Sequence, residues 1–236
     1  MNSNKYKLVK VDSKELWNDL VNSSSNYSLF FSLEYLSLLE TKYNLWLVMQ
    51  GTEVKAGLLL IVSENEKNIV SNDFVIYSGI ILKDYKNTKI AKKTHQSFQI
   101  IEFVSEELTK IYKNITLSLS PEIIDIRPFQ WFNYHNDKKK YKIDIKFPSL
   151  INISELRKKI NYEQTKIFQN LDFARRYNIR AAIKEHCIVQ QSKNVRSFVS
   201  NYKLMMSNQN INISKEKINT MTRVIDYYIH KNKGVL

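Results

Sequence analysis

The chain has 236 residues, of which 43% are hydrophobic and 25% are charged, and this composition excludes a largely disordered protein. Its single cysteine, Cys187, excludes an internal disulfide framework and is typical of a reducing compartment. The formal net charge of +13 fits either an anionic partner, such as nucleic acid, or a lysine-rich composition without a dedicated site. Because the lysines are scattered apart from residues 138–140, we favour the second interpretation for most of the charge.

The sequence contains no signal for a membrane. No apolar run approaches the ~20 residues that span a bilayer, and the first residues lack the apolar centre of a signal peptide. We therefore expect a soluble, cytoplasmic protein without a transmembrane segment. The length suits one large domain, or one domain and part of another.

A strand and two helices are predicted at the beginning of the chain. Residues 5–11 alternate between polar and apolar side chains and predict a short strand. Asp12 or Ser13 is placed to cap a helix. Ser32 is placed to start a second helix, whose apolar residues keep helical spacing as far as Tyr43.

A β-hairpin is predicted next. Residues 45–49 and 54–62 are apolar runs joined by a turn at Gln50 and Gly51. We interpret Gly51 as an ordinary turn glycine.

A second strand pair and a long helix follow the hairpin. Residues 68–70 and 74–82 predict two paired strands, and Gly79 indicates a bulge or a close backbone approach within the second. Residues 89–113 carry apolar side chains at helical spacing and predict an amphipathic helix. Its inner face is expected to contain Phe98, Ile101, Ser105, Leu108 and Tyr112.

The stretch from residue 115 to residue 148 concentrates the unusual side chains. Residues 115–119 predict a short buried strand, and residues 141–147, by their alternation, predict a second strand. Between them, Arg127 precedes a proline, which biases the arginine away from the helical region and places it at the end of an element. An arginine among aromatic side chains can stack on them, and it can bind a carboxylate or phosphate through two parallel hydrogen bonds.

Arg127, Trp131 and Tyr134 are therefore candidate substrate-binding residues. The alternative, which we favour, is that Trp131 fills the seam between the two strands, because large aromatic residues usually pack. Asp125 is expected to form a structural ion pair with Arg127. Tyr134 and His135 have the chemistry for acid–base work, but a surface position is the simpler interpretation of His135.

The rest of the chain is predicted to be mainly helical. Ser154 is placed to cap a long helix that runs or bends through Lys184, and residues 187–191 predict a short strand. Two more helices are predicted at residues 195–206 and 215–230. Core positions are expected for Cys187, Leu204, Met205 and Met206.

A basic stripe is predicted near the end of that long helix. Arg176, Arg180 and Lys184 recur every four residues, so a continuous helix places them on one face. Beside an apolar anchor formed by Ile179, Ala182 and Ile183, this face could bind an anionic ligand such as a diphosphate. The alternative is a solvated helix face, which is the commoner fate of such stripes.

Three parts of the sequence carry a resemblance to a family. The run DIRPFQWFNYH at 125–135, followed by YKIDIKFPSLINIS at 141–154, resembles the middle of bacterial FemAB-like acyltransferases, a branch of the GNAT superfamily. FARRYNIRAAIKEH at 173–186 resembles the arginine-rich end of the helix that follows in that family. FFSLEYLSLLE at 30–40 and NLWLVMQGTEVKAGLLLIVSE at 44–64 resemble the helix and hairpin of its first domain.

The resemblance implies an α/β (α+β) fold with two GNAT-like domains, the second of them truncated. Residues 1–150 would form the first domain, with a central, largely antiparallel mixed sheet flanked by helices. Residues 151–236 would form a long helix and an incomplete, mainly helical second domain. Because the strands that normally carry the donor site are missing from that second domain, we expect the chain alone to bind acyl-CoA weakly or not at all.

The resemblance also implies a reaction. An acyl or aminoacyl group would pass from an acyl-CoA such as acetyl-CoA, or from aminoacyl-tRNA, to an amine. That amine would belong to a small or nucleotide-linked molecule, such as a nucleotide-linked sugar or a cell-envelope precursor.

The sequence lacks the motifs of a self-contained catalytic site. It contains four glycines and no G-x-G, so the glycine-rich loop that lets backbone N–H groups approach a pyrophosphate in GNAT enzymes is not visible. No P-loop, metal-ligand spacing or nucleophile elbow occurs. We therefore predict no metal and assign no catalytic residue.

Three functions stay open at this point. We favour an N-acyltransferase, active or inactive as a short chain. The second is a non-catalytic module that binds the acceptor, and the third is a nucleic-acid-binding protein. A steep loss of RNA or DNA binding with added salt would support the third. The sequence does not indicate an oligomeric state.

Overall fold

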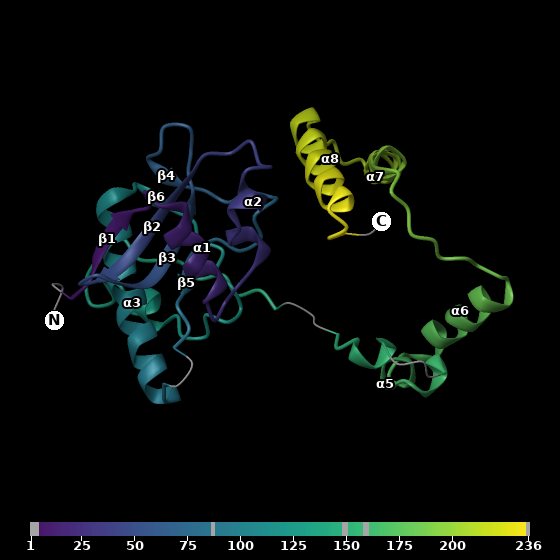
Figure 1. Ribbon diagram of the computed structural model, residues 1–236, viewed down its shortest axis with the longest axis horizontal. Helices are drawn as coiled ribbons and strands as arrows, with labels where there is room; N and C mark the ends of the chain where they lie inside the picture. The colour runs from purple at the N-terminus through teal and green to yellow at the C-terminus, as the bar shows by residue number, and fades with distance from the viewer. Residues whose placement is uncertain (1–4, 86–87, 148–150, 158–160, 235–236) are drawn as a thin grey trace. The chain divides into compact units, whose positions relative to one another are not determined.

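The structure, a computed structural model, describes four stretches of the chain: residues 5–85, 88–147, 151–157 and 161–234. Together they form a mixed α/β protein with a four-stranded antiparallel sheet and eight α-helices (Figure 1). None of the helices in these stretches is long and apolar enough to cross a membrane.

Internal contacts divide the chain into two compact units. The first unit contains residues 5–143 together with residues 194–234, and the second contains residues 144–193. This grouping differs from the division into 1–150 and 151–236 that we expected, because the last two helices belong with the first unit.

The sheet has the strand order β1-β2-β3-β5, and each neighbouring pair is antiparallel. The strands are β1 (Lys7–Lys10), β2 (Tyr43–Gln50), β3 (Glu53–Ile61) and β5 (Gly79–Leu82). The predicted hairpin of β2 and β3 is confirmed. Gly51 in its turn has a φ of +59°, a conformation that glycine adopts without steric cost.

Helices cover both faces of this sheet. One face packs against α3 (Ile90–Ile111), and the other against α1 (Lys14–Asn22), η2 (Leu29–Phe31) and α2 (Leu33–Leu36). From Ala56 to Ile61, β3 is buried on both faces, and its sequence there has no polar side chain and no alternation. Leu58 and Leu60 join the α3 side, whereas Leu59 and Ile61 join the α1 side.

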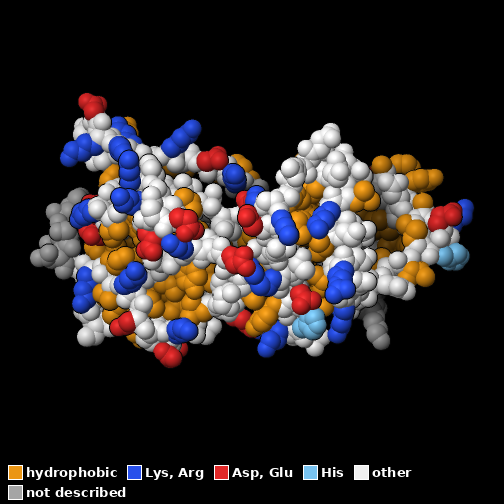
Figure 2. All heavy atoms as spheres, turned by 90° about the horizontal axis from the view of Figure 1, so that it is seen from above, with side chains coloured by type: hydrophobic (Ala, Val, Ile, Leu, Met, Phe, Trp, Pro, Cys, Tyr) orange, Lys and Arg blue, Asp and Glu red, His pale blue; other side chains and the backbone are white. Residues whose placement is uncertain are grey.

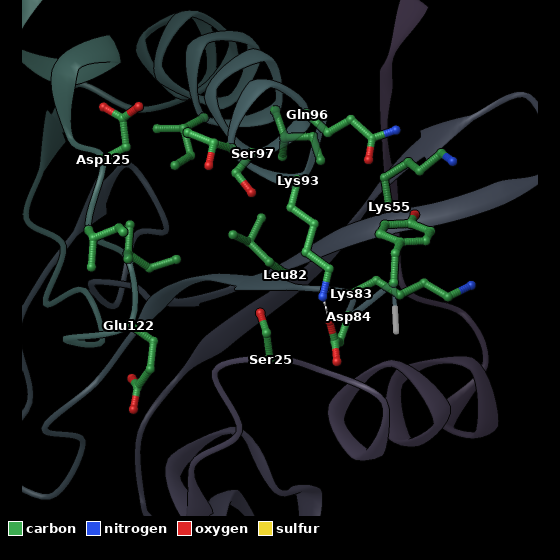
Figure 3. A pocket seen from close by; sticks show the side chains of 16 residues that line it. Ser25, Lys55, Leu82, Lys83, Asp84, Lys93, Gln96, Ser97, Glu122 and Asp125 are labelled. Atoms are coloured by element: carbon green, nitrogen blue, oxygen red, sulfur yellow. Dashed lines mark hydrogen bonds and ion pairs between the residues drawn. The ribbon is translucent and has the colours of Figure 1, made fainter. Parts of the chain in front are cut away.

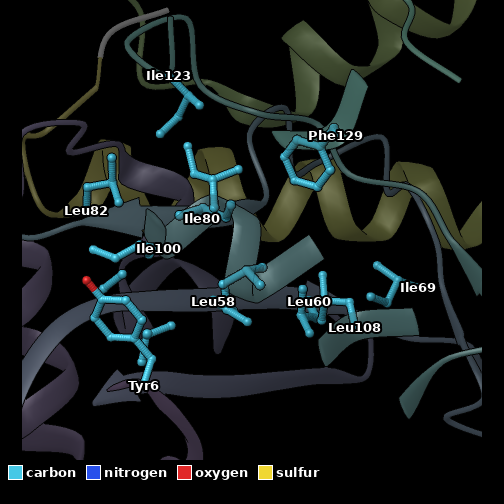
Figure 4. Packing of buried hydrophobic residues seen from close by; sticks show 14 of the residues in the cluster. Tyr6, Leu58, Leu60, Ile69, Ile80, Leu82, Ile100, Leu108, Ile123 and Phe129 are labelled. Carbon is cyan, nitrogen blue, oxygen red and sulfur yellow. The ribbon is translucent and has the colours of Figure 1, made fainter. Parts of the chain in front are cut away.

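The core on the α3 side is shown in Figure 4. Leu58, Leu60 and Ile80 from the sheet meet Ile100 and Leu108 from α3 in this cluster. The predicted inner face of the helix is confirmed at Ile101, Ser105, Leu108 and Tyr112, which are buried, whereas Phe98 is only half-buried.

The core on the α1 side depends on a glycine. A Cβ atom at Gly57 would lie 2.6 Å from Cδ2 of Leu20 and 2.8 Å from Cζ3 of Trp17. The fully buried Trp17 is also fixed by a hydrogen bond of 2.9 Å from its Nε1 to the carbonyl oxygen of Phe31. The missing side chain at residue 57 therefore lets α1 pack directly on β3.

The edge of the sheet at β5 is completed by a side chain. Nδ2 of Asn26 donates to the carbonyl oxygen of Ile80 at 2.9 Å, and its Oδ1 accepts from the backbone N–H of Leu82 at 2.8 Å. Asn26 is only 1% exposed. Its amide thus satisfies the backbone of β5 as a neighbouring strand would.

The first two predicted helices differ in outcome. The first is confirmed, with the Oγ atom of Ser13 accepting from the backbone N–H of Leu16. The second is much shorter than predicted, because α2 ends at Leu36 and Tyr43 already begins β2.

The second predicted strand pair does not form. β4 (Asn68–Ile69) pairs in parallel with β6 (Asn114–Ile115), and the strand expected at 74–82 begins only at Gly79 and pairs with β3. The close approach expected at Gly79 is confirmed. Its φ is +90°, and a Cβ atom there would lie 3.0 Å from Cδ2 of Leu119.

The two strands expected around the aromatic segment are also wrong. Of residues 115–119 only Ile115 lies in a strand, and residues 141–147 form none. The Tyr141 hydroxyl donates instead to the carbonyl oxygen of Ser105 in α3, while Phe147 is exposed. An alternating pattern forms a strand only where another strand satisfies its backbone groups.

The second unit contains short helices instead of the predicted long one. They are η3 (Ser154–Arg157), η4 (Tyr162–Gln164), α5 (Lys166–Gln169) and α6 (Phe173–Lys184). The helix is interrupted because the side chains of Asn161, Thr165 and Asp172 each cap a new helix start. The strand expected at 187–191 does not form, and Cys187 is exposed.

The last two helices, α7 (Val195–Asn208) and α8 (Lys215–His230), confirm the prediction. Nε of Arg223 in α8 donates to the carbonyl oxygen of Leu38 at 2.7 Å, and the Tyr227 hydroxyl donates to Oε1 of Glu34 at 2.6 Å. These bonds attach α8 to the segment around α2. Core positions for Leu204 and Met205 are wrong, because both are exposed on α7, and Met206 is half-buried.

Replacing Gly57 by alanine is expected to lower the free energy of unfolding by about 1–3 kcal/mol, because the new methyl group overlaps Leu20 and Trp17. Urea unfolding monitored by circular dichroism measures this loss. Gly234→Ala is the matched control, since its Cβ atom would meet neighbours only at 3.5 Å and beyond. Equal stability of both variants and the parent would contradict the close packing of α1 on β3.

Replacing Asn26 by alanine is expected to cost about 2 kcal/mol or more, because two buried backbone groups of β5 lose their partners. Asn26→Asp should not restore stability, since a carboxylate cannot donate to the carbonyl of Ile80. Asn22→Ala, at an exposed position, serves as the control. Hydrogen exchange at Leu82 measures the effect directly, and unchanged protection there would refute it.

Candidate functional site

A cavity of about 190 Å³ lies where the end of β5 meets the first turns of α3 (Figure 3). Leu82, Ile100 and Ile101 give it an apolar floor. Its polar lining consists of Ser25, Lys55, Lys83, Asp84, Tyr85, Lys93, Thr94, Gln96, Ser97, Glu122 and Asp125.

Strand pairing places two lysines at one side of this cavity. The backbone N–H of Lys83, after β5, donates to the carbonyl oxygen of Lys55 in β3 at 3.2 Å. Nζ of Lys55 lies 2.7 Å from Oε2 of Glu53 and 5.1 Å from the ring centre of Tyr85. Burial alone would lower the pKa of Lys55, but the hydrogen bond to Glu53 and the contact with Tyr85 outweigh it and raise that pKa. This side therefore stays positively charged at neutral pH.

A third lysine joins the two elements that form the cavity. Nζ of Lys93, in the first part of α3, lies 2.7 Å from Oδ1 of Asp84. Nearby, Oε1 of Gln96 is buried and has no hydrogen-bond partner among the residues that the structure describes. Buried acceptors are rarely left unpaired, so this atom is available to a donor from water or a ligand.

The opposite side of the cavity carries carboxylates, as Figure 3 shows for Glu122 and Asp125. The Ser120 hydroxyl donates to Oε2 of Glu122. Nε and Nη2 of Arg127 donate to the two oxygens of Asp125 at 2.8 and 2.7 Å. These hydrogen bonds lower the pKa of Asp125, so its carboxylate stays ionised. Glu122 and Asp125 together with Arg127 thus carry a formal charge of −1 at this side of the cavity, and the three lysines together with Glu53 and Asp84 carry +1 at the other.

Two of the predicted site residues lie together next to this acidic side. α4 (Arg127–Trp131) begins at Arg127, whose guanidinium group lies 5.3 Å from the ring centre of Phe98 and 5.4 Å from that of Trp131. The expected ion pair with Asp125 is present. Arg127 therefore orients a cavity carboxylate and stacks on two aromatic rings.

Trp131 does not fill a seam between strands, contrary to the interpretation that we favoured. It is 54% exposed, whereas Phe129, two residues earlier, is 5% exposed and packs edge-on against Tyr141. The short helix α4 turns Phe129 inward and Trp131 outward. Exposure of Trp131 keeps its candidacy as a recognition residue.

Tyr134 lies apart from this pair. Its exposed ring meets the His135 ring at 5.0 Å and the Lys140 ammonium group at 6.0 Å. Among the described residues, no contact of its ring with Arg127 or Trp131 is found.

Arg176, Arg180 and Lys184 belong to the second unit, where the continuous helix α6 places them on one face as predicted. Nε of Arg180 donates to Oε1 of Glu163 at 2.6 Å, and its guanidinium group stacks 5.3 Å from the ring centre of Phe168. A ligand role for these three residues stays a prediction.

Sequence reasoning missed Lys55, Lys83, Lys93 and Glu122. One signal was available for Lys83 and Lys93, which flank the junction of a predicted strand and a predicted helix. Nothing in the sequence indicated that Glu122 would lie across from them.

Within the described stretches, no group of histidine, cysteine and acidic residues could hold a metal ion.

The charged side chains on one face of the molecule are mixed in sign. On the face shown in Figure 2, basic and acidic side chains alternate, and no broad field of one sign covers it. This distribution agrees with our interpretation that most of the net charge belongs to the composition.

Comparison with protein-family models, with curated proteins and with solved structures found no match to this chain.

Trp131→Ala is expected to change stability by only about 1 kcal/mol, since the ring is exposed and contributes mainly its contacts with Phe98 and Arg127. Phe129→Ala should cost about 3–5 kcal/mol, because it empties a buried site. Thermal unfolding of both variants measures the difference. A larger loss for Trp131→Ala than for Phe129→Ala would contradict the orientation of α4.

Proposed function

We propose that this chain is the acceptor-binding part of an N-acyltransferase and that the cavity between β5 and α3 holds the amine acceptor. The observation that carries this proposal is the separation of charge across the cavity. Glu122 and Asp125 lie on one side, where an ammonium group would be attracted, and Lys55, Lys83 and Lys93 lie on the other, where an anionic group would be attracted. Amino-sugar phosphates, and the amines of nucleotide-linked sugars, combine these two groups in one molecule.

The size of the cavity supports a small acceptor. A cavity of about 150 Å³ holds a ligand as large as benzene, so 190 Å³ suits a single sugar ring whose phosphate reaches toward the lysines. Drug-sized ligands occupy pockets of about 300–1,000 Å³.

The acyl donor does not fit this cavity. Acyl-CoA and aminoacyl-tRNA are far larger than its volume, and none of the four glycines lines it to let the backbone approach a pyrophosphate. We therefore assign no step of the transfer to the donor here and no catalytic role to the described residues. The role of the cavity is to bind and orient the amine.

Each group at the cavity has a defined task in this proposal. Asp125, held ionised by Arg127, attracts the ammonium group, and Glu122 accepts a hydrogen bond from it. Lys83 binds the anionic group, while Lys55 and Lys93 are held by Glu53 and Asp84 and supply charge. Gln96 accepts a hydrogen bond from a sugar hydroxyl, which satisfies its buried oxygen.

The arrangement of the first unit also supports the proposal. The helix α2 followed by the hairpin of β2 and β3 gives the order of helix and hairpin that the FemAB-like resemblance implies. A GNAT-like fold, and a cytoplasmic location in keeping with the exposed free thiol of Cys187, form part of this proposal.

Isothermal titration with four compounds tests the charge separation. Glucosamine 6-phosphate carries both groups and is expected to bind. Glucose 6-phosphate lacks the amine and glucosamine lacks the phosphate, so each should bind about tenfold more weakly or worse, because a charged cavity group loses its partner. Acetyl-CoA should bind weakly or not at all.

Variants identify which side of the cavity recognises which group. Glu122→Gln should remove the preference for glucosamine 6-phosphate over glucose 6-phosphate. Lys83→Met should remove its preference over glucosamine. Lys10→Met, which changes an exposed lysine of β1, is the control. Absence of binding by all three sugars, or equal binding of the three, would refute the proposal.

A further inference from the structure

The second unit has a small core that fixes α6. Phe168 is 5% exposed, meets the Tyr162 ring edge-on at 5.1 Å, and lies under the guanidinium group of Arg180. The two oxygens of Glu155 accept from the backbone N–H groups of Lys166 and Ile167, each at 3.1 Å. These contacts anchor α6 through Arg180, and none of the residues of α6 is buried.

Two exposed aromatic rings lie on the same face of α6 as Arg180. Phe173 is 76% exposed and Tyr177 is 62% exposed, which is unusual for large aromatic side chains in a helix. They are four residues apart, so they lie on one face about 6 Å apart along the axis. Neither ring takes part in an aromatic contact with another residue that the structure describes.

Basic side chains surround these rings. Arg180 and Lys184 follow Phe173 by seven and eleven residues and share its face, and Arg176 flanks it. Among the described residues, the side chains of Arg176 and Lys184 form no ion pair. Arg180 uses its Nε atom for Glu163 and keeps its two terminal nitrogens for another acceptor.

The surrounding sequence is also basic. Between residues 144 and 193 there are ten lysine or arginine residues and five acidic residues, a net charge of +5. Three of the acidic residues are engaged inside the unit. Glu155 and Asp172 accept from backbone N–H groups at helix starts, and Glu163 pairs with Arg180. The face of α6 that carries Phe173, Tyr177 and Arg180 therefore offers positive charge and aromatic rings together.

We propose that this face of α6 binds single-stranded nucleic acid, with bases stacked on Phe173 and Tyr177 and phosphates bound by Arg176, Arg180 and Lys184. Aromatic rings accept any unpaired base, and arginine and lysine bind the backbone without regard to sequence. A duplex hides the faces of its bases, so it can satisfy only the basic residues. This binding is independent of the cavity in the first unit.

Fluorescence anisotropy with a labelled oligouridylate and the full chain tests the proposal. The parent protein is expected to bind, and its affinity should fall steeply as salt is raised. The double variant Phe173→Leu with Tyr177→Leu keeps apolar bulk but removes the rings. It should bind about tenfold more weakly or worse, with an unchanged salt dependence.

The double variant Arg176→Gln with Lys184→Gln removes two phosphate contacts. The slope of log affinity against log salt should therefore become shallower by about 1.4. Lys10→Gln with Lys113→Gln removes the same charge from exposed positions of the first unit and should leave that slope unchanged. Because all the altered side chains are at least partly exposed, melting temperatures should stay close to that of the parent.

Several outcomes would overturn the proposal. They are absence of binding to the oligouridylate, parental affinity of the ring variant, and equal competition by a duplex of the same length. Binding to vesicles of phosphatidylcholine with anionic phosphatidylglycerol, without binding to the oligouridylate, would assign the same face to a membrane surface instead.

Discussion

The contact between α1 and β3 at Gly57 is the constraint on which the first unit depends. β3 is buried on both sides, so one helix layer must pack on each face, and the layer on the α1 side reaches the strand only because residue 57 has no side chain. With β3 fixed between the layers, β5 pairs along it and Asn26 closes the remaining edge. The end of β5 and the start of α3 are then held at a defined distance, and the cavity forms between them.

The cavity derives its character from groups that hold each other ionised. Glu53 and Tyr85 stabilise the ammonium form of Lys55, and Arg127 stabilises the carboxylate of Asp125. Counted with Glu53 and Asp84, the three lysines leave a formal charge of +1 on one side, and Glu122 and Asp125 counted with Arg127 leave −1 on the other, so a gradient crosses the apolar floor. Such a gradient favours a ligand that carries both signs of charge, which is the property on which the proposed acceptor role rests.

The second unit uses arginine differently. In α6, Arg180 is part of the scaffold, because it covers Phe168 and pairs with Glu163, and it still presents nitrogens to solvent. Phe173 and Tyr177 gain no such cover and stay exposed. The two units therefore carry two different candidate sites, a cavity lined by charged groups in the first and an open aromatic and basic face in the second.

Local sequence signals determined the elements whose stability is local. The β2–β3 hairpin follows from two apolar runs around Gly51, α3 and α8 follow from long stretches of helical spacing, and Ser13 caps α1 as its position indicated. The stripe of Arg176, Arg180 and Lys184 on α6 also needed nothing beyond helical periodicity.

Tertiary structure decided the features that depend on partners distant in sequence. Residues 141–147 alternate like a strand, yet no strand lies beside them to satisfy their backbone, and Tyr141 bonds to α3 instead. Trp131 is exposed, contrary to the expectation, and Phe129 is buried, because the short helix α4 sets which ring points inward. Glu122 and Lys83 are far apart in sequence and carry no common motif, so only the packing of β5 against α3 and the segment before α4 places them across one cavity. Periodicity specifies which face of an element is apolar, but it cannot specify which element that face will meet.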